Sequence, residues 1–322
     1  MNRRQMIAGT SASIVAATMG AGKTAALPAA EADAAYAERW HRKRRFAALP
    51  AGQIAYMDAG AGPAALFIHG FPLNGFQWRH AVERLSSIRR CIAPDSLGKG
   101  FTKVAKGQSV SPAAQVSMLA SLLDHLGIDA VDLVANDSGV AVAQLFAVAH
   151  PARVRTMLLT NGDVEPDSPP PALLPVLDLA AKGRFADEWL VPWLKDKKLA
   201  RSAEGLGGLC FSKPGQPTDT AIDMYLGPLV ANAERKAQVN AYAMALAPNP
   251  LAGIEAKLSQ LQIPTRIVWG MQDNIFDPRM PDYLDDILPQ SRGVRRVAEG
   301  KLFWPEEYPD ILEAELRQLW RS

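Results

Sequence analysis

Short apolar runs alternate with longer helical patterns along this chain from about Phe46 onward. Parallel strands are buried on both faces and need a helix to connect them, so the alternation predicts an α/β protein with a mostly parallel sheet flanked by helices. Helical spacing and alanine-rich faces at 112–126 and 140–150 fit such packing. The strands are expected at 53–57, 65–68, 90–94, 130–135, 154–160, 266–269 and 293–297.

The alternation stops after Thr160 and gives way to a mainly helical pattern. The break is marked by Asn161, Gly162 and the run at 168–171, which are turn-forming residues. An apolar, β-branched run resumes after Pro264. The expected organisation is a core made of 33–162 and 249–322, interrupted by a helical cap at 163–248.

Composition limits the classes of function. The chain has 322 residues, of which 48% are hydrophobic, so it can bury a full core. Its formal net charge of +2 is too small to attract nucleic acid strongly, and a small-molecule ligand is expected instead. No motif calls for a metal or an organic cofactor. Cys91 and Cys210 are the only cysteines, and we expect both to be free and buried, although the sequence leaves open whether they pair.

Arg3 and Arg4 precede an uncharged apolar run at 6–22, which is the pattern of an export signal and resembles the twin-arginine type. We expect residues 1–32 to be removed, which would give a periplasmic or secreted protein without stable membrane insertion. A retained membrane anchor is the alternative. The basic residues at 42–45 would form a solvated arm near the new N-terminus.

The strongest functional signal is the segment 131–144, VDLVANDSGVAVAQ, in which an apolar strand turns directly into a helix with Asp137 at the apex. Unpaired N–H groups and the dipole at the start of a helix favour a carboxylate there. The segment resembles the nucleophile elbow of α/β hydrolases, with Asp137 where many members carry serine. Ala135 replaces the usual first glycine, and Gly139 is retained. The alternative is that Asp137 only caps the helix.

A second segment, 65–78 with the sequence ALFIHGFPLNGFQW, resembles the strand and loop that supply the oxyanion hole in the same superfamily. The resemblance implies that the backbone N–H groups of Phe71 and Ser138 stabilise negative charge beside the nucleophile. His69 would hold the loop rather than transfer a proton. Asp95, in the string APDSLGKGFT, corresponds to a structural aspartate of the superfamily.

The catalytic triad of the superfamily is incomplete in this chain. Its acid follows the penultimate strand, where Asp273 ends the run IVWGMQD, and Asp163 is the alternative position that some dehalogenase-like relatives use. Its histidine should precede the string FWPEE, but Leu302 stands in that place. The chain's five histidines all precede the predicted cap, at His41, His69, His80, His125 and His150.

The missing histidine affects the second half of the expected reaction. An aspartate nucleophile forms an ester that base-activated water must hydrolyse, and a general base contributes about a hundredfold to ten-thousandfold in rate. The candidate substitutes are Lys301, Glu299, Glu306 and, less directly, His80. Each is more simply explained as a solvated or structural side chain.

Three aromatic residues of the predicted cap, Trp189, Tyr225 and Tyr242, are candidates for substrate contacts, although aromatic residues at helical spacing more often form core. Epoxide hydrolases of this fold use two cap tyrosines to protonate the opening oxygen, which would here be Tyr225 and Tyr242. Haloalkane dehalogenases have a tryptophan directly after the nucleophile and often an asparagine in the oxyanion loop. This chain has Ser138 and Phe71 at those places.

The sequence therefore predicts an α/β-hydrolase-fold hydrolase that acts on a small organic molecule through Asp137. It would be similar to haloalkane dehalogenases, fluoroacetate dehalogenases and epoxide hydrolases, with Asp273 as the triad acid and an atypical or missing base. The alternatives are a lyase, isomerase or cyclase that uses Asp137 as an acid or base, and a catalytically silent ligand-binding protein. The substrate and the oligomeric state are left open.

Overall fold

The computed structural model describes residues 29–321, so most of the predicted export signal, 1–32, lies outside the described residues. The sheet has nine strands within this part of the chain, in the order β1-β2-β4-β3-β6-β7-β8-β9, with β5 paired to β2. Pairings that involve β2 are antiparallel and all others are parallel. The strands are β1 (Arg45–Leu49), β2 (Gly52–Ala59), β3 (Ala64–Ile68), β4 (Arg90–Pro94), β5 (Lys103–Val104), β6 (Val131–Asp137), β7 (Val154–Gly162), β8 (Thr265–Gly270) and β9 (Ser291–Val297).

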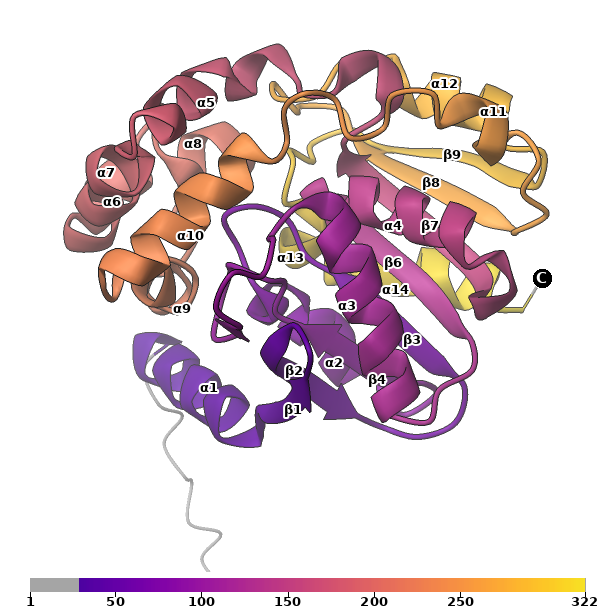
Figure 1. Cartoon of the computed structure of the whole chain (residues 1–322), viewed down its shortest axis with the longest axis horizontal. Helices are drawn as coiled ribbons and strands as arrows, with labels where there is room; N and C mark the ends of the chain where they lie inside the picture. Colours follow the sequence, from indigo (N-terminus) through magenta and orange to yellow (C-terminus); the bar gives the residue numbers. More distant parts are fainter. Residues whose placement is uncertain (1–28, 322) are drawn as a thin grey trace, which may run out of the picture.

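Helices cover both faces of the sheet, with α3 and α4 on one face and α2 and α14 on the other (Figure 1). The core helices are α2 (Arg79–Leu85), α3 (Pro112–His125), α4 (Ser138–Ala149), α11 (Glu255–Leu258), α12 (Met280–Ile287), α13 (Trp304–Glu307) and α14 (Pro309–Leu319). No helix in residues 29–321 combines the length and the apolar character needed to cross a membrane.

A group of helices inserted between β7 and β8 gathers on one side of the sheet (Figure 1). They are α5 (Leu174–Ala181), α6 (Val191–Lys195), α7 (Lys197–Ala200), α8 (Leu206–Cys210), α9 (Asp219–Val230) and α10 (Ala233–Met244). We call these helices the cap. The chain enters the cap from the carboxyl end of a parallel strand, which is the edge where open α/β sheets place their ligands.

The predicted α/β architecture is confirmed, and each of the seven predicted strands coincides with an observed one. Two strands, β1 and β5, were not predicted. The strand β5 is only two residues long, and β1 begins within a basic run, so neither has the apolar pattern by which the other strands are recognised. Cys91 and Cys210 are free and buried, as expected.

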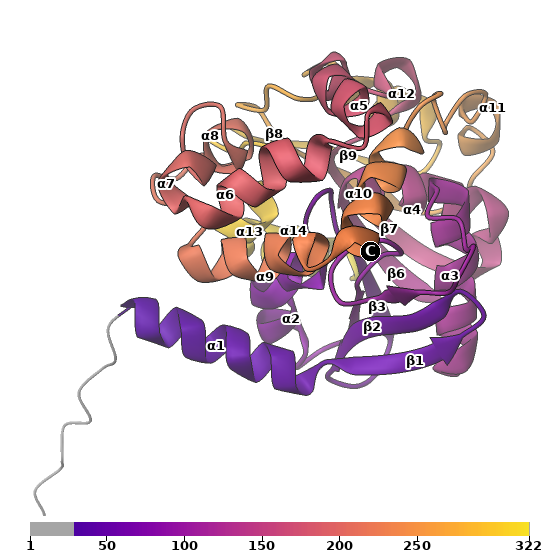
Figure 2. The ribbon, with the colours of Figure 1, turned by 60° about the vertical axis from the view of Figure 1, so that its left-hand side comes forward.

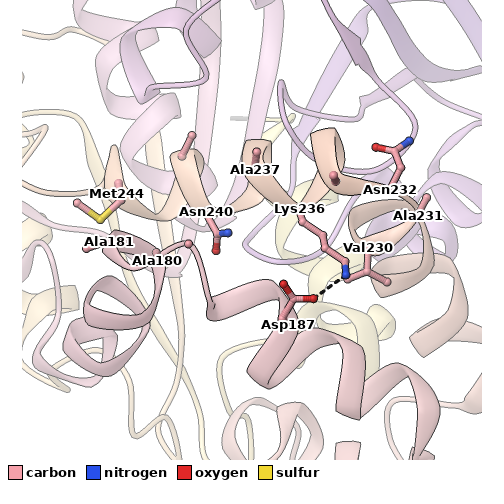
Figure 3. A pocket seen from close by; sticks show the side chains of 13 residues that line it. Ala180, Ala181, Asp187, Val230, Ala231, Asn232, Lys236, Ala237, Asn240 and Met244 are labelled. Carbon is pink, nitrogen blue, oxygen red and sulfur yellow. Dashed lines mark hydrogen bonds and ion pairs between the residues drawn. The ribbon is translucent and has the colours of Figure 1, made fainter.

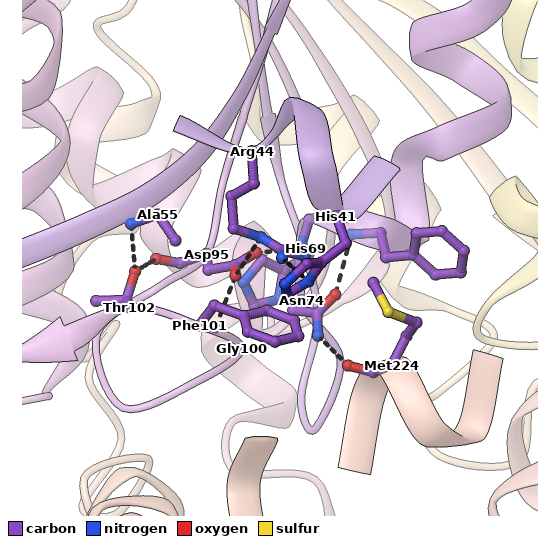
Figure 4. A network of polar contacts seen from close by, with 12 residues as sticks. His41, Arg44, Ala55, His69, Asn74, Asp95, Gly100, Phe101, Thr102 and Met224 are labelled. Atoms are coloured by element: carbon purple, nitrogen blue, oxygen red, sulfur yellow. Dashed lines mark hydrogen bonds and ion pairs between the residues drawn. The ribbon is translucent and has the colours of Figure 1, made fainter. Parts of the chain in front are cut away.

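Of the basic residues at 42–45, which we expected to form a solvated arm, Arg42, Lys43 and Arg45 are exposed but Arg44 is not. Arg45 begins the edge strand β1. The Arg44 side chain is buried, with Nε 3.9 Å from Asp95 Oδ2 and the guanidinium 3.6 Å from the centroid of the Phe101 ring. Asp95 also accepts hydrogen bonds from two backbone N–H groups in this cluster (Figure 4). A buried carboxylate and an aromatic ring therefore hold Arg44 in place. The charge composition of the sequence does not predict these contacts.

Helix α1 (Ala29–Lys43) runs beside α9 of the cap (Figure 2). Its Trp40 packs edge-on against Phe76 of the core, with ring centroids 5.8 Å apart. The hydroxyl of Thr218, at the start of α9, donates a hydrogen bond to Asp33 of α1 at 2.5 Å. Helix α1 is therefore joined to both the core and the cap.

A buried polar cluster anchors the cap to the core. Arg79 Nη2 of helix α2 lies 2.8 Å from Glu306 Oε1 of α13. The Tyr225 hydroxyl of cap helix α9 accepts a hydrogen bond from Arg79 at 3.1 Å and donates one to Glu306 at 2.7 Å. All three side chains are buried, so each depends on the other two for compensation of its charge or polarity.

The anchor predicts a large loss of stability when one charge is removed. Glu306→Gln should lower the free energy of unfolding by about 3 kcal/mol, because Arg79 stays buried without its counter-charge. Tyr225→Phe should cost about 1 kcal/mol. Urea denaturation followed by circular dichroism measures both. Asp310→Asn, which removes an exposed partner of Arg84, is the control and should cost less than about 1 kcal/mol. A Glu306→Gln protein as stable as this control would contradict the anchoring role.

Candidate active site

Strand β6 passes into helix α4 through Asp137 without an intervening loop. Asp137 has φ 55° and ψ −132°, and it is the one non-glycine residue with a positive φ in the described chain. Such a conformation costs on the order of 1–3 kcal/mol and persists only where the surrounding structure enforces it. Asp137 thus lies at the apex of a strained turn, which is the position that the sequence pattern predicts.

Glycines allow neighbouring backbone to close on this turn. A Cβ atom on Gly139 would lie 2.5 Å from the carbonyl oxygen of Ile68, and one on Gly70 would lie 2.5 Å from Asp137 Oδ2. Both distances are far shorter than van der Waals contact, so a side chain at either position would push the two strand ends apart. The carboxyl ends of β3 and β6 therefore meet at Asp137.

The loop after β3 holds the Asp137 carboxylate. The backbone N–H of Phe71 donates a hydrogen bond to Asp137 Oδ2 at 2.6 Å. The Asp137 side chain makes no capping bond to α4, so the alternative in which it only caps the helix is wrong. No described residue hydrogen-bonds to Oδ1. Ser138, the other predicted oxyanion residue, begins α4, and its Oγ accepts a hydrogen bond from the Tyr242 hydroxyl at 2.9 Å.

Asp137 faces a mostly apolar cavity of about 240 Å³ between the core and the cap. This volume is below the usual range for drug-sized ligands, so it suits a small substrate. Residues of both parts of the molecule form its wall, including Phe71, Pro72, Asp137, Asp163, Ala172, Val176, Phe185, Trp189, Trp193, Leu206, Cys210, Leu246, Asn274, Phe276 and Leu302.

The three predicted substrate contacts of the cap are separated by the fold. Trp189 lines the cavity. Tyr242 lies behind the wall, where its ring stacks on that of Phe71 with centroids 5.3 Å apart. Tyr225 belongs to the buried anchor with Arg79 and is absent from the cavity wall in the described structure. The geometry therefore does not bring the two tyrosines together at Asp137.

A wider groove of about 790 Å³ lies on the cap between α5 and α10, away from Asp137 (Figure 3). It contains an ion pair in which Lys236 Nζ lies 2.5 Å from Asp187 Oδ1. Because these charges satisfy each other, the groove presents no unpaired catalytic group. Among residues 29–321, no group of three or more His, Cys, Asp or Glu side chains is arranged to hold a metal ion.

A second carboxyl group, that of Asp163, lines the same cavity. It follows strand β7, whose last residue, Gly162, is the register partner of Asp137 on β6. A Cβ atom on Gly162 would lie 2.4 Å from the Asp137 carbonyl oxygen, so the glycine lets the two strand ends converge. Burial raises the pKa of Asp163 to about 7, and burial together with the charge of Asp163 raises the pKa of Asp137.

Asp273, the first candidate for the triad acid, has both carboxylate oxygens engaged. Oδ2 accepts a hydrogen bond from the Asn161 side chain, and Oδ1 accepts one from the backbone N–H of Ile275, each at 2.9 Å. Burial raises the pKa of Asp273 to about 6. Asp273 is not among the described residues that line the cavity, whereas Asp163 is.

All five histidines lie within the described residues, and none of them lines the cavity. Leu302, which occupies the expected histidine position, forms part of the wall. The ring of His69 is fixed beneath the loop, because its Nε2 accepts the backbone N–H of Ser96 at 3.0 Å and its Nδ1 lies 2.8 Å from the carbonyl oxygen of Gly70. Burial lowers the pKa of His80 to about 4, and its ring packs beside Tyr36.

The side chains that the sequence suggested as replacements for the missing histidine do not point into the cavity. Lys301 Nζ donates a hydrogen bond to the carbonyl oxygen of Gly208 at 2.5 Å. Glu306 is paired with Arg79 in the anchor, and Glu299 is exposed. None of these groups lines the cavity in the described structure.

A buried lysine was missed by the sequence analysis. Lys99 is fully buried, and its Nζ lies 3.7 Å from the centroid of the Tyr242 ring with no hydrogen-bond partner among the described residues. Burial lowers the pKa of Lys99, while the charges of Asp137 and Asp163 raise it. The signal available in the sequence was a lysine between two glycines, Gly98 and Gly100, in a loop that leaves the sheet. Lys99 therefore brings positive charge close to two buried carboxyl groups.

The raised pKa of Asp163 predicts a pH-dependent loss of stability. A carboxyl group that binds its proton more tightly in the folded protein stabilises the fold at low pH, and this contribution is lost as the pH rises from about 4 to about 7. Asp163→Asn should therefore raise the melting temperature relative to the wild type, by about 2 °C or more at pH 8. Thermal unfolding between pH 4 and pH 8.5 measures the difference. A difference that does not grow with pH would contradict the shift.

The parallel sheet, the strained turn at Asp137 and the inserted cap define an α/β-hydrolase fold. The family model described as alpha/beta hydrolase fold matches residues 63–198. Haloalkane dehalogenase 2 of Mycobacterium tuberculosis is 25% identical over 291 residues, which cover 87% of this chain and 93% of the relative. Epoxide hydrolase 2 of Siraitia grosvenorii is 45% identical over 101 residues, which cover 31% of this chain and 32% of the relative.

A solved structure extends the similarity to the whole fold. A thermophilic esterase from Thermogutta terrifontis is 25% identical and superposes with a TM-score of 0.70 over 86% of this chain and 98% of the esterase. The chain therefore has the α/β-hydrolase fold and is similar in sequence to the dehalogenase and the esterase along most of its length.

Proposed function

We propose that this protein is a hydrolase that acts on a small, largely apolar organic substrate through Asp137 as the nucleophile. The observation that carries the proposal is the carboxylate itself: Phe71 N–H fixes Oδ2, while Oδ1 has no described partner beside an apolar cavity. A carboxylate held in this way has one oxygen restrained and the other available to attack carbon. The relatives of the chain named as haloalkane dehalogenase and epoxide hydrolase support the same class.

The chemistry proceeds in two steps. Asp137 Oδ1 forms a bond to a substrate carbon while the bond to the leaving group breaks, and the leaving group departs with the electron pair. The result is an ester on Asp137. Water then attacks the ester carbonyl carbon, and the backbone N–H of Phe71 stabilises the negative charge that develops on the carbonyl oxygen. Breakdown of this intermediate releases an alcohol, which carries one proton of the water, and Asp137 returns to the carboxylate by losing the other proton to solvent.

The leaving group is either a halide ion or the ring oxygen of an epoxide, which stays attached to the neighbouring carbon and takes a proton from water. The halide contact typical of dehalogenases is weakened here, because Ser138 follows the nucleophile and its hydroxyl is bonded to Tyr242. The proton donors typical of epoxide hydrolases are also altered, since Tyr225 is bonded to Glu306. A panel that contains both substrate classes is therefore the appropriate test.

The proposal includes export from the cytoplasm by a twin-arginine-type signal and action in the periplasm or outside the cell. Support comes from Arg3, Arg4 and the apolar run at 6–22. Removal of residues 1–32 would keep Asp33, whose carboxylate binds Thr218 of the cap. The mature protein would then keep the contact between α1 and the cap.

A single turnover in H₂¹⁸O tests the nucleophile directly. The wild type and Asp137→Asn are incubated with haloalkanes, haloacids and epoxides, and both the intact protein and the peptide that contains Asp137 are weighed. Because water attacks the ester carbonyl, ¹⁸O should appear in Asp137 of the wild type and not in the first product released. Asp137→Asn should form neither ester nor product.

Other results would point to the alternatives. Product that carries ¹⁸O after one turnover, with unlabelled Asp137, would contradict the covalent mechanism. Conversion of a substrate without any ester would favour a lyase, isomerase or cyclase. Thermal stabilisation by a ligand without turnover would favour a binding protein.

A further inference from the structure

We infer that Asp163 takes the place of the missing histidine, as the base that activates water against the ester formed on Asp137. The inference rests on the proposed function, because it concerns the second of the two steps. It differs from the usual role of an aspartate at this position, which is to orient a histidine. No histidine lines the cavity in residues 29–321, so Asp163 has no histidine there to orient.

The strand register brings the two carboxyl groups to one site. Asp137 and Gly162 are partners on adjacent parallel strands, which lie about 4.8 Å apart, and Asp163 is the next residue along β7. Both Asp137 and Asp163 line the cavity, and the charge of Asp163 raises the pKa of Asp137. A water molecule in this cavity would therefore lie beside the ester and the second carboxylate together.

Asp163 is also the carboxyl group that is available for the task. Its Oδ1 accepts a hydrogen bond from the Ser168 hydroxyl at 2.9 Å, which fixes the side chain, and no described side chain forms an ion pair with it. Asp273 has both oxygens engaged and is absent from the described cavity wall. Cys210 lines the cavity, but burial raises the pKa of its thiol well above the usual value, so it stays protonated.

The surroundings of Asp163 give it the proton affinity that a base near neutral pH needs. Burial raises its pKa to about 7, and the charge of Asp167 acts in the same direction. The hydrogen bond from Ser168 and the charge of Lys99 lower the pKa and so act in the opposite direction. Asp137 is the other carboxyl group on the described cavity wall, and the ester removes its charge during the step concerned. A general base is most effective when its pKa is close to the working pH.

The Asp163 carboxylate removes a proton from water as the water oxygen bonds to Cγ of the Asp137 ester. The tetrahedral intermediate collapses, the bond from Cγ to the substrate oxygen breaks, and that oxygen takes the proton from Asp163. The products are an alcohol, the Asp163 carboxylate and the carboxylic acid of Asp137, which keeps the water oxygen and returns to the carboxylate by losing the second water proton to solvent. No oxidant, reductant or metal takes part.

The test is a trapping experiment on the full chain with 1-bromobutane and 1,2-epoxybutane as probes. Asp163→Asn keeps the size of the side chain and the acceptor for Ser168, but it cannot take a proton. Its ester should form and then persist, with hydrolysis slowed about a hundredfold or more, and intact-protein mass spectrometry should detect the adduct. Asp167→Asn, a neighbouring acidic residue outside the cavity wall, is the matched control and should turn over without an adduct.

Three results would overturn the inference. If Asp163→Asn turns over like the wild type while Asp137→Asn is inactive, the proposed function stands and another base acts. If Asp273→Asn accumulates the ester and Asp163→Asn does not, the base is at Asp273. If the wild type and all variants form neither adduct nor product with either probe, the proposed function and this inference fail together.

Two further measurements separate a base from a structural residue. Formate should restore ester hydrolysis in Asp163→Ala, because a small carboxylate can occupy the vacated part of the cavity. In the wild type, the rate of ester hydrolysis should rise with pH and reach half its maximum near pH 7. Lys99→Met should move this midpoint to higher pH, since the lysine charge opposes protonation of Asp163. A pH midpoint that is unchanged in Lys99→Met, or no rescue by formate, would count against the inference.

Discussion

One hydrogen bond, from the backbone N–H of Phe71 to Asp137 Oδ2, unites the features on which this site depends. It requires the strained backbone of Asp137, the two glycines that let the ends of β3 and β6 approach, and a loop that is itself fixed by His69. The contact gives the carboxylate a defined orientation in a place that water reaches poorly. The rest of the sheet can be seen as the scaffold that holds this one donor and acceptor together.

The site contains several ionisable groups that are buried, although burying a charged group lowers the stability of the fold. Asp137, Asp163 and Lys99 are buried together, and burial disfavours the charged form of each. The anchor formed by Arg79, Tyr225 and Glu306 is different, since its charges satisfy one another. The first group is therefore suited to exchanging protons, whereas the anchor is suited to holding two parts of the chain in register.

Much of the fold, and part of the site, could be predicted from the sequence. The strands were recognisable because buried parallel strands are continuously apolar, and Asp137 was recognisable because strand, turn and helix follow without a gap. The burial of Arg44 and of Lys99 could not be predicted, because both depend on groups distant in sequence. The same limit explains why Tyr225 and Tyr242 looked equivalent, although one lies at the anchor and the other behind the cavity wall.

The position of the anchor has a consequence for how molecules enter and leave. The cap is fastened to the core by Tyr225 of α9, whereas α5 follows the point where the chain enters the cap. Two exposed residues of the cavity wall, Ala172 and Asn274, lie where the chain enters the cap and where it leaves β8. A substrate that passes between Ala172 and Asn274 would be selected by size before it meets Asp137, so substitutions at these two positions could change the substrate range without disturbing the reacting groups.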